Sequence, residues 1–203
     1  IFIRFPNFYK TVDRNIYYRK VKYACEAATR IIAISDQTTE DIIKYFKVNP
    51  KKIETIHQAV GPVYFDQQNT TGLHEKYELP EKFILSVGTI EHRKNQLTLL
   101  KALKSGKIET PVVFIGEPTI YATELLKYIS ENKLDSQVKF LTKVPEEDLA
   151  GLYQIADASV YISVFEGFGL PVIEAMSCGC PVLTSNVSCL PETSGDAAML
   201  CNP

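Results

Sequence analysis

The chain has 203 residues, of which 45% are hydrophobic and 23% charged, and its net charge is −2 at pH 7. This composition is ordinary for a globular protein of one large or two small domains, and without a basic excess we expect no nucleic acid as a partner. No apolar run approaches the roughly 20 residues that span a bilayer, so we expect a soluble, cytoplasmic protein.

Short apolar runs alternate with segments of helical periodicity along the whole chain, which is typical of a parallel α/β architecture. The expected strands are 30–35, 52–58, 83–87, 111–115, 138–141, 158–162, 181–184 and 197–200. The expected helices are 15–28, 37–46, 96–103, 119–132, 146–155 and 171–178. Capping residues precede three of them: Ser35 or Asp36, Asn95 and Pro145.

A polar, turn-rich stretch at 61–72 divides the chain into two unequal pieces. It begins with Gly61-Pro62 and ends with Gly72. Fewer than about 80 residues with two strands form a poor independent core. We therefore expect the first piece to lean on the second, or on another copy of the chain.

The five cysteines, at positions 25, 178, 180, 189 and 201, are odd in number and show no C-x-x-C spacing. This pattern predicts free thiols in a reducing compartment, with neither a disulfide framework nor a zinc site. The three histidines also lack metal-ligand spacing, so we expect no bound metal. Neither a complete dinucleotide fingerprint nor a P-loop occurs, which argues against NAD and ATP.

The segment Glu166-Gly167-Phe168-Gly169-Leu170-Pro171-Val172-Ile173-Glu174 places one carboxylate on a Gly-rich loop and another on the helix that the loop opens. Pro171 suits the start of a helix, and the glycines allow close approach of backbone amides to a ligand. A helix N-terminus attracts phosphate. The segment therefore suits a nucleotide sugar, with amides on the diphosphate and sugar and the two carboxylates on hydroxyls at either end.

Arg93 and Lys94 follow the expected strand 83–87 and precede the helix 96–103. In a parallel sheet this position lies at the carboxyl edge, where ligands bind. Two cations there would clamp a diphosphate and stabilise the negative charge that develops on a leaving phosphate. The alternative is a solvated loop with charges that flank a helix.

The acidic segment resembles the signature of the retaining GT-B glycosyltransferases, specifically glycosyltransferase family 4 (glycosyl transferases group 1). Ser86-Val87-Gly88-Thr89-Ile90-Glu91-His92-Arg93-Lys94-Asn95 resembles the strand–loop–helix that carries this family's phosphate-binding Arg and Lys. Leu190-Pro191-Glu192, followed by Gly195-Asp196-Ala197-Ala198, resembles the stretch after the last signature strand. The similarity runs over roughly the whole chain, with strong motifs only after Phe83.

The resemblance implies a GT-B type α/β fold with a doubly wound parallel sheet. Residues 1–75 would be the partial end of an N-terminal, acceptor-side, Rossmann-like domain with its linker, and residues 76–203 a nucleotide-sugar-binding C-terminal domain, truncated at its end. In the family, a loop with a catalytic His precedes a segment like residues 1–6, and the chain runs on beyond residues 199–203. We therefore expect a piece of a longer enzyme, inactive by itself.

The resemblance also implies roles for individual residues. Arg93, Lys94 and Glu166 would be catalytic, with Glu166 positioning the donor sugar. The donor would be bound by Gly88, Thr89, Phe168, Gly169, Leu170 and Glu174, the last through the ribose hydroxyls. Many relatives have Arg after the glycine, where this chain has Thr89. Arg93 and Lys94 would therefore supply the positive charge that binds the phosphates. Contacts with the donor base are expected from the backbone near Gly116 and Val144.

The implied function, in polysaccharide biosynthesis, is transfer of a hexose, with mannose as a candidate, from a GDP- or UDP-linked donor to a saccharide acceptor. Configuration would be retained, and no metal or cofactor would be needed beside the donor. Arg19, Lys20 and Lys22 alternate with tyrosines and suit either a solvated helix face or contact with an acceptor or anionic lipid. A lipid-linked acceptor and peripheral contact with the inner face of the membrane therefore stay open.

Other functions remain as alternatives. The chain by itself would be a nucleotide-sugar-binding module without turnover, or the protein would be a GT-B-like epimerase. A phosphorylase would carry a cofactor lysine site, which the sequence does not show. Glycoside hydrolysis needs two carboxylates about 5–10 Å apart across one bond, whereas Glu166 and Glu174 should be spread along a nucleotide.

Overall fold

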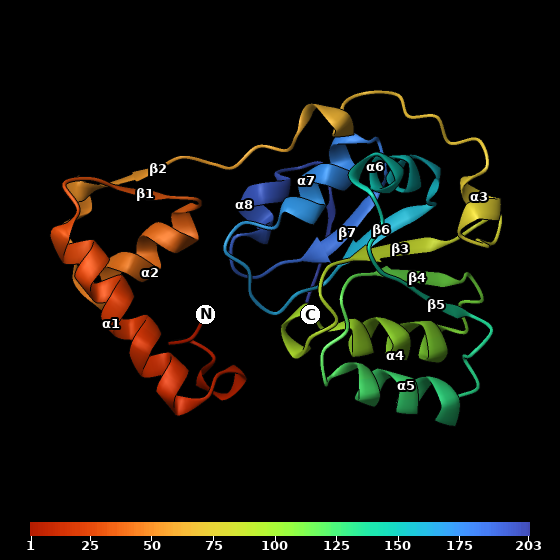
Figure 1. The fold of residues 1–203 in the computed structure, drawn as a ribbon, viewed down its shortest axis with the longest axis horizontal. Helices are drawn as coiled ribbons and strands as arrows, with labels where there is room; N and C mark the ends of the chain where they lie inside the picture. Colours follow the sequence, from red (N-terminus) through yellow and green to blue (C-terminus); the bar gives the residue numbers. More distant parts are fainter.

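The computed structural model describes residues 1–203 as two parts joined by an extended segment (Figure 1). The smaller part contains the helices α1 (Thr11–Ala27) and α2 (Asp36–Phe46), and a parallel pair of strands, β1 (Ile31–Ala33) and β2 (Ile53–Thr55). Two 3-10 turns, Pro6–Phe8 and Pro50–Lys52, complete it. Only Cys25, Ala33 and Ser35 are buried among its first 60 residues.

The larger part is built on a parallel sheet of six strands in the order β5-β4-β3-β6-β7-β8. The strands are β3 (Ile84–Val87), β4 (Val112–Ile115), β5 (Val138–Leu141), β6 (Ala158–Tyr161), β7 (Val182–Ser185) and β8 (Met199–Cys201). The chain starts in the middle at β3, proceeds outward to β5, and returns to β6 on the other side of β3. The predicted doubly wound sheet is therefore present, and the carboxyl ends of β3 and β6 meet where the winding direction changes, the usual place for a ligand.

Helices cover both faces of the sheet (Figure 1). On one face, α4 (Gln96–Gly106) and α5 (Ala122–Glu131) pack over a cluster that includes Leu100, Phe114 and Leu125. On the other, α6 (Glu146–Ile155) and α7 (Leu170–Ser177) pack over a cluster that includes Leu85 and Tyr153. Neighbouring strand residues contribute to opposite clusters because successive side chains of a strand point to opposite faces, so both faces are apolar.

All eight predicted strands and all six predicted helices are present, with bounds that differ by a few residues. Two short helices, α3 (Leu73–Lys76) and α8 (Leu190–Ser194), were not predicted, since four or five residues are too few to show helical periodicity. Ser35 caps α2 as expected, because its hydroxyl accepts a hydrogen bond from the Thr38 amide.

The predicted cap of α4 is wrong in its chemistry. Asn95 lies at the N-cap position, but its backbone has the left-handed φ of 59° and its side chain caps no amide. Its amide group instead donates to the Ile162 carbonyl at 3.3 Å, and its Oδ1 accepts from the Thr98 hydroxyl at 2.7 Å. Asn95 therefore ties the loop after β3 to the loop after β6. Pro145 precedes α6 and likewise makes no side-chain cap.

The polar stretch between the two pieces packs against the larger part. Its 3-10 turn, Pro62–Tyr64, buries Tyr64, whose ring lies edge-on to Tyr153 of α6 with 6.4 Å between the centroids. Further along, the backbone amide of Gln68 donates to the side-chain Oε1 atom of Gln154 at 3.0 Å. The division into domains at residues 75 and 76 stays a prediction.

None of the helices combines the length and the apolar character needed to cross a bilayer.

Candidate functional site

Two loops at the carboxyl edge of the sheet form the candidate site. The loop after β3 contains the 3-10 turn His92–Lys94, which carries Arg93 and Lys94. The loop after β6 carries Glu166 and leads into α7, which carries Glu174. Because β3 and β6 are neighbours in the sheet, residues more than 70 positions apart in the sequence are brought side by side.

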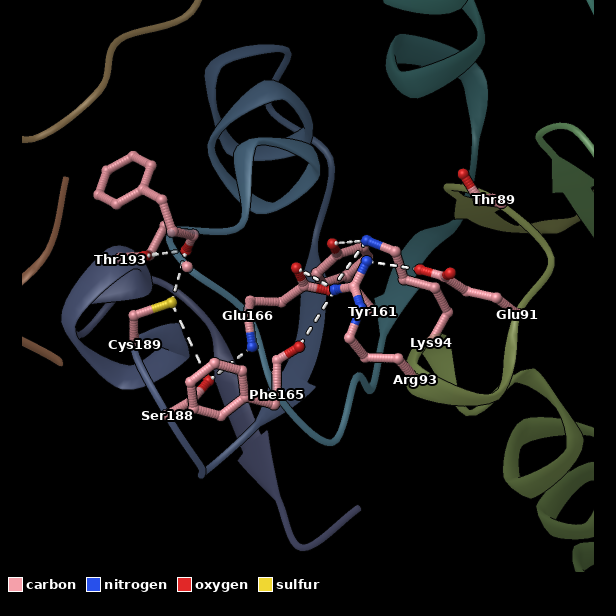
Figure 2. Close-up of polar contacts among 12 residues, drawn as sticks. Thr89, Glu91, Arg93, Lys94, Tyr161, Phe165, Glu166, Ser188, Cys189 and Thr193 are labelled. Carbon is pink, nitrogen blue, oxygen red and sulfur yellow. Dashed lines mark hydrogen bonds and ion pairs between the residues drawn. The ribbon is translucent and has the colours of Figure 1, made fainter. Parts of the chain in front are cut away.

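Three of the predicted site residues converge in one ion cluster, shown in Figure 2. The Arg93 Nη1 atom lies 2.5 Å from the Glu166 Oε2 atom, and the Lys94 Nζ atom lies 2.8 Å from Oε1. Each carboxylate oxygen of Glu166 therefore has its own cation. All three side chains are mostly buried, with 9% of the Glu166 side chain exposed.

Two residues that the sequence analysis missed complete the cluster. Glu91 binds the other end of the Arg93 guanidinium, with 2.5 Å between Oε1 and Nη2. The Lys94 ammonium donates to the Tyr161 hydroxyl at 2.5 Å and lies 4.7 Å from the centre of that ring. The Glu-x-Arg spacing was a possible signal for Glu91, whereas Tyr161 reads as an ordinary strand residue and offered none.

The charges of this cluster depend on one another. Burial acts to raise the pKa of the Glu166 carboxyl, but the charges of Lys94 and Arg93 outweigh it and hold that pKa below its ordinary value. Burial lowers the pKa of the Lys94 ammonium, against the opposing effect of Glu166. In this arrangement the charges of Arg93 and Lys94 are balanced by those of Glu91 and Glu166.

Glu174 lies outside the ion cluster. Its Oε2 atom accepts a hydrogen bond from the hydroxyl of the buried Tyr153 at 3.1 Å. Burial raises the pKa of the Glu174 carboxyl, while the Tyr153 hydrogen bond opposes this. No cation forms an ion pair with Glu174, so the second acid of the segment is a hydrogen-bond acceptor in a less charged environment.

The start of α7 presents backbone donors. Within the chain, the amide groups of residues 167–170 donate no hydrogen bond, and no side chain caps the helix. Gly169 precedes the helix with a φ of 99°, and a Cβ there would lie 2.7 Å from Leu190 Cδ2. The position therefore needs glycine, and the unpaired amides beside Glu166 suit an anionic or hydroxyl-bearing ligand.

Phe168 and Thr89 lie apart from the ion cluster. The buried Phe168 ring stacks on His57 at 5.6 Å between centroids, and its carbonyl accepts from Thr193 Oγ1 and Cys189 Sγ at 2.5 and 3.1 Å. Thr89 is exposed, and its carbonyl accepts from Gln96 at 3.0 Å. Their expected donor contacts stay predictions.

Gly88 brings the loop after β3 close to Lys94 and to the neighbouring strand β4. Its φ is 139°, and a Cβ at this position would lie 3.4 Å from the Lys94 side chain. An apolar hollow of about 260 Å³ lies beyond it at the ends of β4 and β5, lined among others by Ile90, Gly116 and Phe140. Of the two positions predicted to contact the base, Gly116 lines this hollow.

No group of three or more His, Cys, Asp or Glu side chains is arranged to hold a metal ion. All five cysteines are unpaired. Burial raises the pKa of the Cys180 thiol to about 12 and that of Cys189 to about 11, so these thiols are poor nucleophiles.

Comparisons with known proteins place the chain in a family. A family model described as "Glycosyl transferases group 1" matches residues 70–203. The O-antigen chain mannosyltransferase B of Escherichia coli is 35% identical over 96% of this chain and 53% of its own length. The serotype-specific mannosyltransferase WbdA of Escherichia coli is 33% identical over 98% of this chain and 25% of its own length. The chain thus spans about half, or less, of these curated relatives.

Solved structures share the fold. A structure of Anabaena Alr3699/HepE in complex with UDP and glucose superposes with a TM-score of 0.81 at 22% identity, over 92% of this chain and 53% of that one. Sucrose-phosphate synthase from Thermosynechococcus elongatus superposes with a TM-score of 0.78 at 26% identity, over 93% of this chain and 49% of that one. Both matches extend over the smaller and the larger part of the chain.

Proposed function

Because the chain belongs to the glycosyl transferases group 1 family of glycosyltransferases, we propose that the whole protein transfers a hexose from a nucleoside-diphosphate donor to a saccharide acceptor with retention of configuration. Mannose is the proposed sugar, since two relatives at 33–35% identity are named mannosyltransferases. The proposed donor is GDP- or UDP-linked. UDP is kept because a protein of this fold has been solved with UDP and glucose.

The observation that carries this proposal is the convergence of Arg93 and Lys94 on Glu166 (Figure 2), beside the unpaired amides of residues 167–170. Cations and free amides are the groups that bind a diphosphate. The donor diphosphate would lie between the cations and the start of α7. Its base would lie toward the hollow at Gly116, and its sugar beside Glu166.

In the proposed reaction, the bond between the anomeric carbon and the phosphate oxygen breaks, and its electron pair goes to the phosphate. Arg93 and Lys94 stabilise this charge, which is the largest contribution that such a site can make. The acceptor oxygen forms the new bond on the same face of the sugar, and the departing phosphate oxygen takes its proton. Glu166 accepts hydrogen bonds from the sugar, and Glu174 from the ribose.

We propose a cytoplasmic site of action with a saccharide acceptor. One relative, from Campylobacter jejuni, is 33% identical over 83% of this chain and 45% of its own length, and its name includes a diphospho-undecaprenol-linked saccharide. A lipid-linked acceptor is therefore included among those to be tested. The exposed side chains of Arg19, Lys20 and Lys22 on α1 support peripheral contact with an anionic membrane surface.

The proposal is tested by a thermal-shift panel on the whole protein with GDP, UDP and ADP, each also as its sugar conjugates. A ligand that binds only the folded state raises the apparent midpoint, and one base should exceed the others. The matching donor is then incubated with saccharide acceptors. Lys94→Met should lose most of the shift and at least about 100-fold of turnover, whereas Lys101→Met, at an exposed position of α4, should lose neither.

Three results would contradict the proposal. If no nucleotide shifts the midpoint, the site is not a nucleotide site. If a donor binds but transfers to no acceptor, the protein is a binding module. If an epimerised nucleotide sugar forms without acceptor, the protein is an epimerase.

A further inference from the structure

The loop that carries Glu166 is held from the smaller part of the molecule. Two hydroxyl groups at the start of α2 lie against the Gly167 carbonyl: the Ser35 hydroxyl donates to it at 2.7 Å, and the Thr38 hydroxyl at 3.3 Å. These contacts span more than 120 positions of sequence. Ser35 is fully buried at this junction, although the smaller part buries little else.

The start of α2 fixes the direction of these hydroxyls. Ser35 Oγ accepts a hydrogen bond from the Thr38 amide at 3.0 Å, which is its capping bond. Since a hydroxyl carries one proton and two acceptor sites, the Ser35 proton is left for the Gly167 carbonyl or for Thr38 Oγ1, and in either arrangement the pair donates at least one hydrogen bond to Gly167. The Thr38 hydroxyl lies 2.9 Å from Ser35 Oγ. The helix cap therefore prepares a pair of hydroxyls aimed at a carbonyl in the other part of the chain.

Side chains on both sides of Gly167 are also covered by the smaller part. Phe165 contacts the Phe5 ring at 5.6 Å between centroids, and the Arg4 guanidinium lies 5.1 Å from the Phe165 ring centre. On the other side, Phe168 stacks on His57. A Cβ at Gly167 would lie 3.3 Å from Ile34 Cδ1, so the Ile34 side chain packs against the Gly167 backbone.

Glu166 lies between these anchored residues. Its own amide donates to Ser188 Oγ at 3.1 Å, and its carboxylate faces Arg93 and Lys94. The carbonyl held by the two hydroxyls lies one residue further on, in the peptide that joins Gly167 to Phe168. The direction of the Glu166 side chain is therefore set from three sides, of which one belongs to the smaller part.

We propose that Ser35 and Thr38 are positioning residues for Glu166: their hydroxyls hold the Gly167 carbonyl and keep the Glu166 carboxylate oriented at the cations. The inference rests on the proposed function for the reaction that it affects. Catalytic groups act only within narrow limits of geometry, and a displacement of about 1 Å can cost about 100-fold in rate. Both hydroxyls make their hydrogen bonds with each other and with the Gly167 carbonyl, so they act through the loop.

The test compares two neighbouring threonines of α2 in the whole protein. Thr38→Val removes the hydroxyl at Gly167. Thr39→Val is the matched control, because the Thr39 hydroxyl pairs with Thr55 Oγ1 at 2.8 Å inside the smaller part. Thr38→Ser restores the hydroxyl, and Ser35→Ala removes the shorter bond together with the helix cap. The readouts are kcat and KM for the nucleotide sugar, affinity for the nucleoside diphosphate, and hydrogen exchange of the Glu166 amide.

We expect Thr38→Val to lower kcat about fivefold and Ser35→Ala about tenfold or more, with less than about twofold change in nucleoside-diphosphate affinity. The Glu166 amide should exchange faster in both variants. Thr38→Ser should restore kcat, and Thr39→Val should leave kcat and this exchange rate unchanged. If the two hydroxyls only stabilised the fold, Thr38→Val and Ser35→Ala would lower the thermal midpoint, but kcat and the exchange of the Glu166 amide would not change in this way.

The inference is overturned if Thr38→Val and Ser35→Ala both keep the wild-type kcat and exchange rate, or if Thr39→Val lowers kcat as much as they do. Failure of the proposed function gives a different result, namely no turnover of any nucleotide sugar by the wild-type protein. In that case the exchange of the Glu166 amide alone decides whether the two hydroxyls hold the loop.

Discussion

At the scale of single residues, Glu166 balances two cations that the sequence analysis assigned to a diphosphate. Arg93 and Lys94 each contact a different oxygen of its carboxylate, and Arg93 also keeps Glu91. A buried charge pair costs much when one partner is removed, because the other is left without compensation. Glu166 therefore contributes to the stability of the fold in addition to the role proposed for it with the donor.

We expect Glu166→Gln to lower the free energy of unfolding at pH 7 by about 3 kcal/mol. This is the lower end of the range for removing one partner of a buried ion pair, because Arg93 would still be paired with Glu91. The pKa of the Glu166 carboxyl is below its ordinary value in the folded state. Its contribution is therefore present above the ordinary value near 4.5 and is lost as the pH falls through the lower, folded-state value.

The difference in unfolding free energy between wild type and Glu166→Gln should accordingly shrink from pH 6 to pH 3, as measured by urea unfolding. Glu147→Gln, at an exposed position of α6, serves as the charge control and should change stability by less than about 0.5 kcal/mol. A difference that stays constant over this pH range would refute the assigned role of the carboxylate charge.

At the scale of secondary-structure elements, the site depends on the close approach of the loops that follow β3 and β4. The Gly88 amide donates to the Ile115 carbonyl at 2.8 Å, which continues the ladder of the sheet into the loops. A Cβ at Gly116 would lie 2.1 Å from the Gly88 carbonyl oxygen. Glycine at position 116 therefore allows the two loops to touch, and it fixes the loop that carries Arg93 and Lys94.

We expect Gly116→Ala to destabilise the fold by about 3 kcal/mol, because backbone rather than a flexible side chain must move. Gly61→Ala is the control. Its φ is −64°, its nearest neighbour would be 3.6 Å from the added Cβ, and stability should change by less than about 1 kcal/mol. Thermal unfolding with an independent measure of nucleotide binding tests both variants. Equal effects of the two substitutions would show that the loop contact is unimportant.

At the scale of the whole molecule, both hydrophobic clusters lie in the larger part. Their buried members run from Tyr64 to Leu190, and none comes from the first 60 residues. The smaller part has two strands of three residues each and is attached through polar and aromatic contacts with the loop at 165–168 and with Glu192 of α8. The expectation that the smaller part leans on the larger one, or on another copy of the chain, stays a prediction.

We expect residues 61–203 to fold without the first 60 residues and residues 1–60 not to fold alone, because small two-stranded units bury too little apolar surface. The larger piece should keep a cooperative thermal transition by circular dichroism, with its midpoint below that of the full chain. The smaller piece should show at most weak helical signal from α1, without a transition. Cooperative unfolding of residues 1–60 would contradict this view.

The sequence by itself determined most of the secondary structure and the edge of the sheet at which the candidate site residues lie. Short, largely apolar runs predicted β3 to β8, and the signal is most continuous in β4, which is buried along its whole length. The order of strands and helices predicted the doubly wound sheet, and strand ends located Arg93, Lys94 and Glu166 at one edge. The assignment of these residues to a glycosyltransferase came from motifs, and periodicity alone did not supply it.

Only the tertiary structure decided which groups meet. The pairing of both cations with Glu166, the contact of Tyr161 with Lys94, and the hold of Ser35 on Gly167 join residues 67 to 132 positions apart. Helix and strand periodicity records which face of an element is buried and not which residue it will touch. Such contacts follow from the packing of the whole chain, and for that reason the partners of each charge appeared only in the folded molecule.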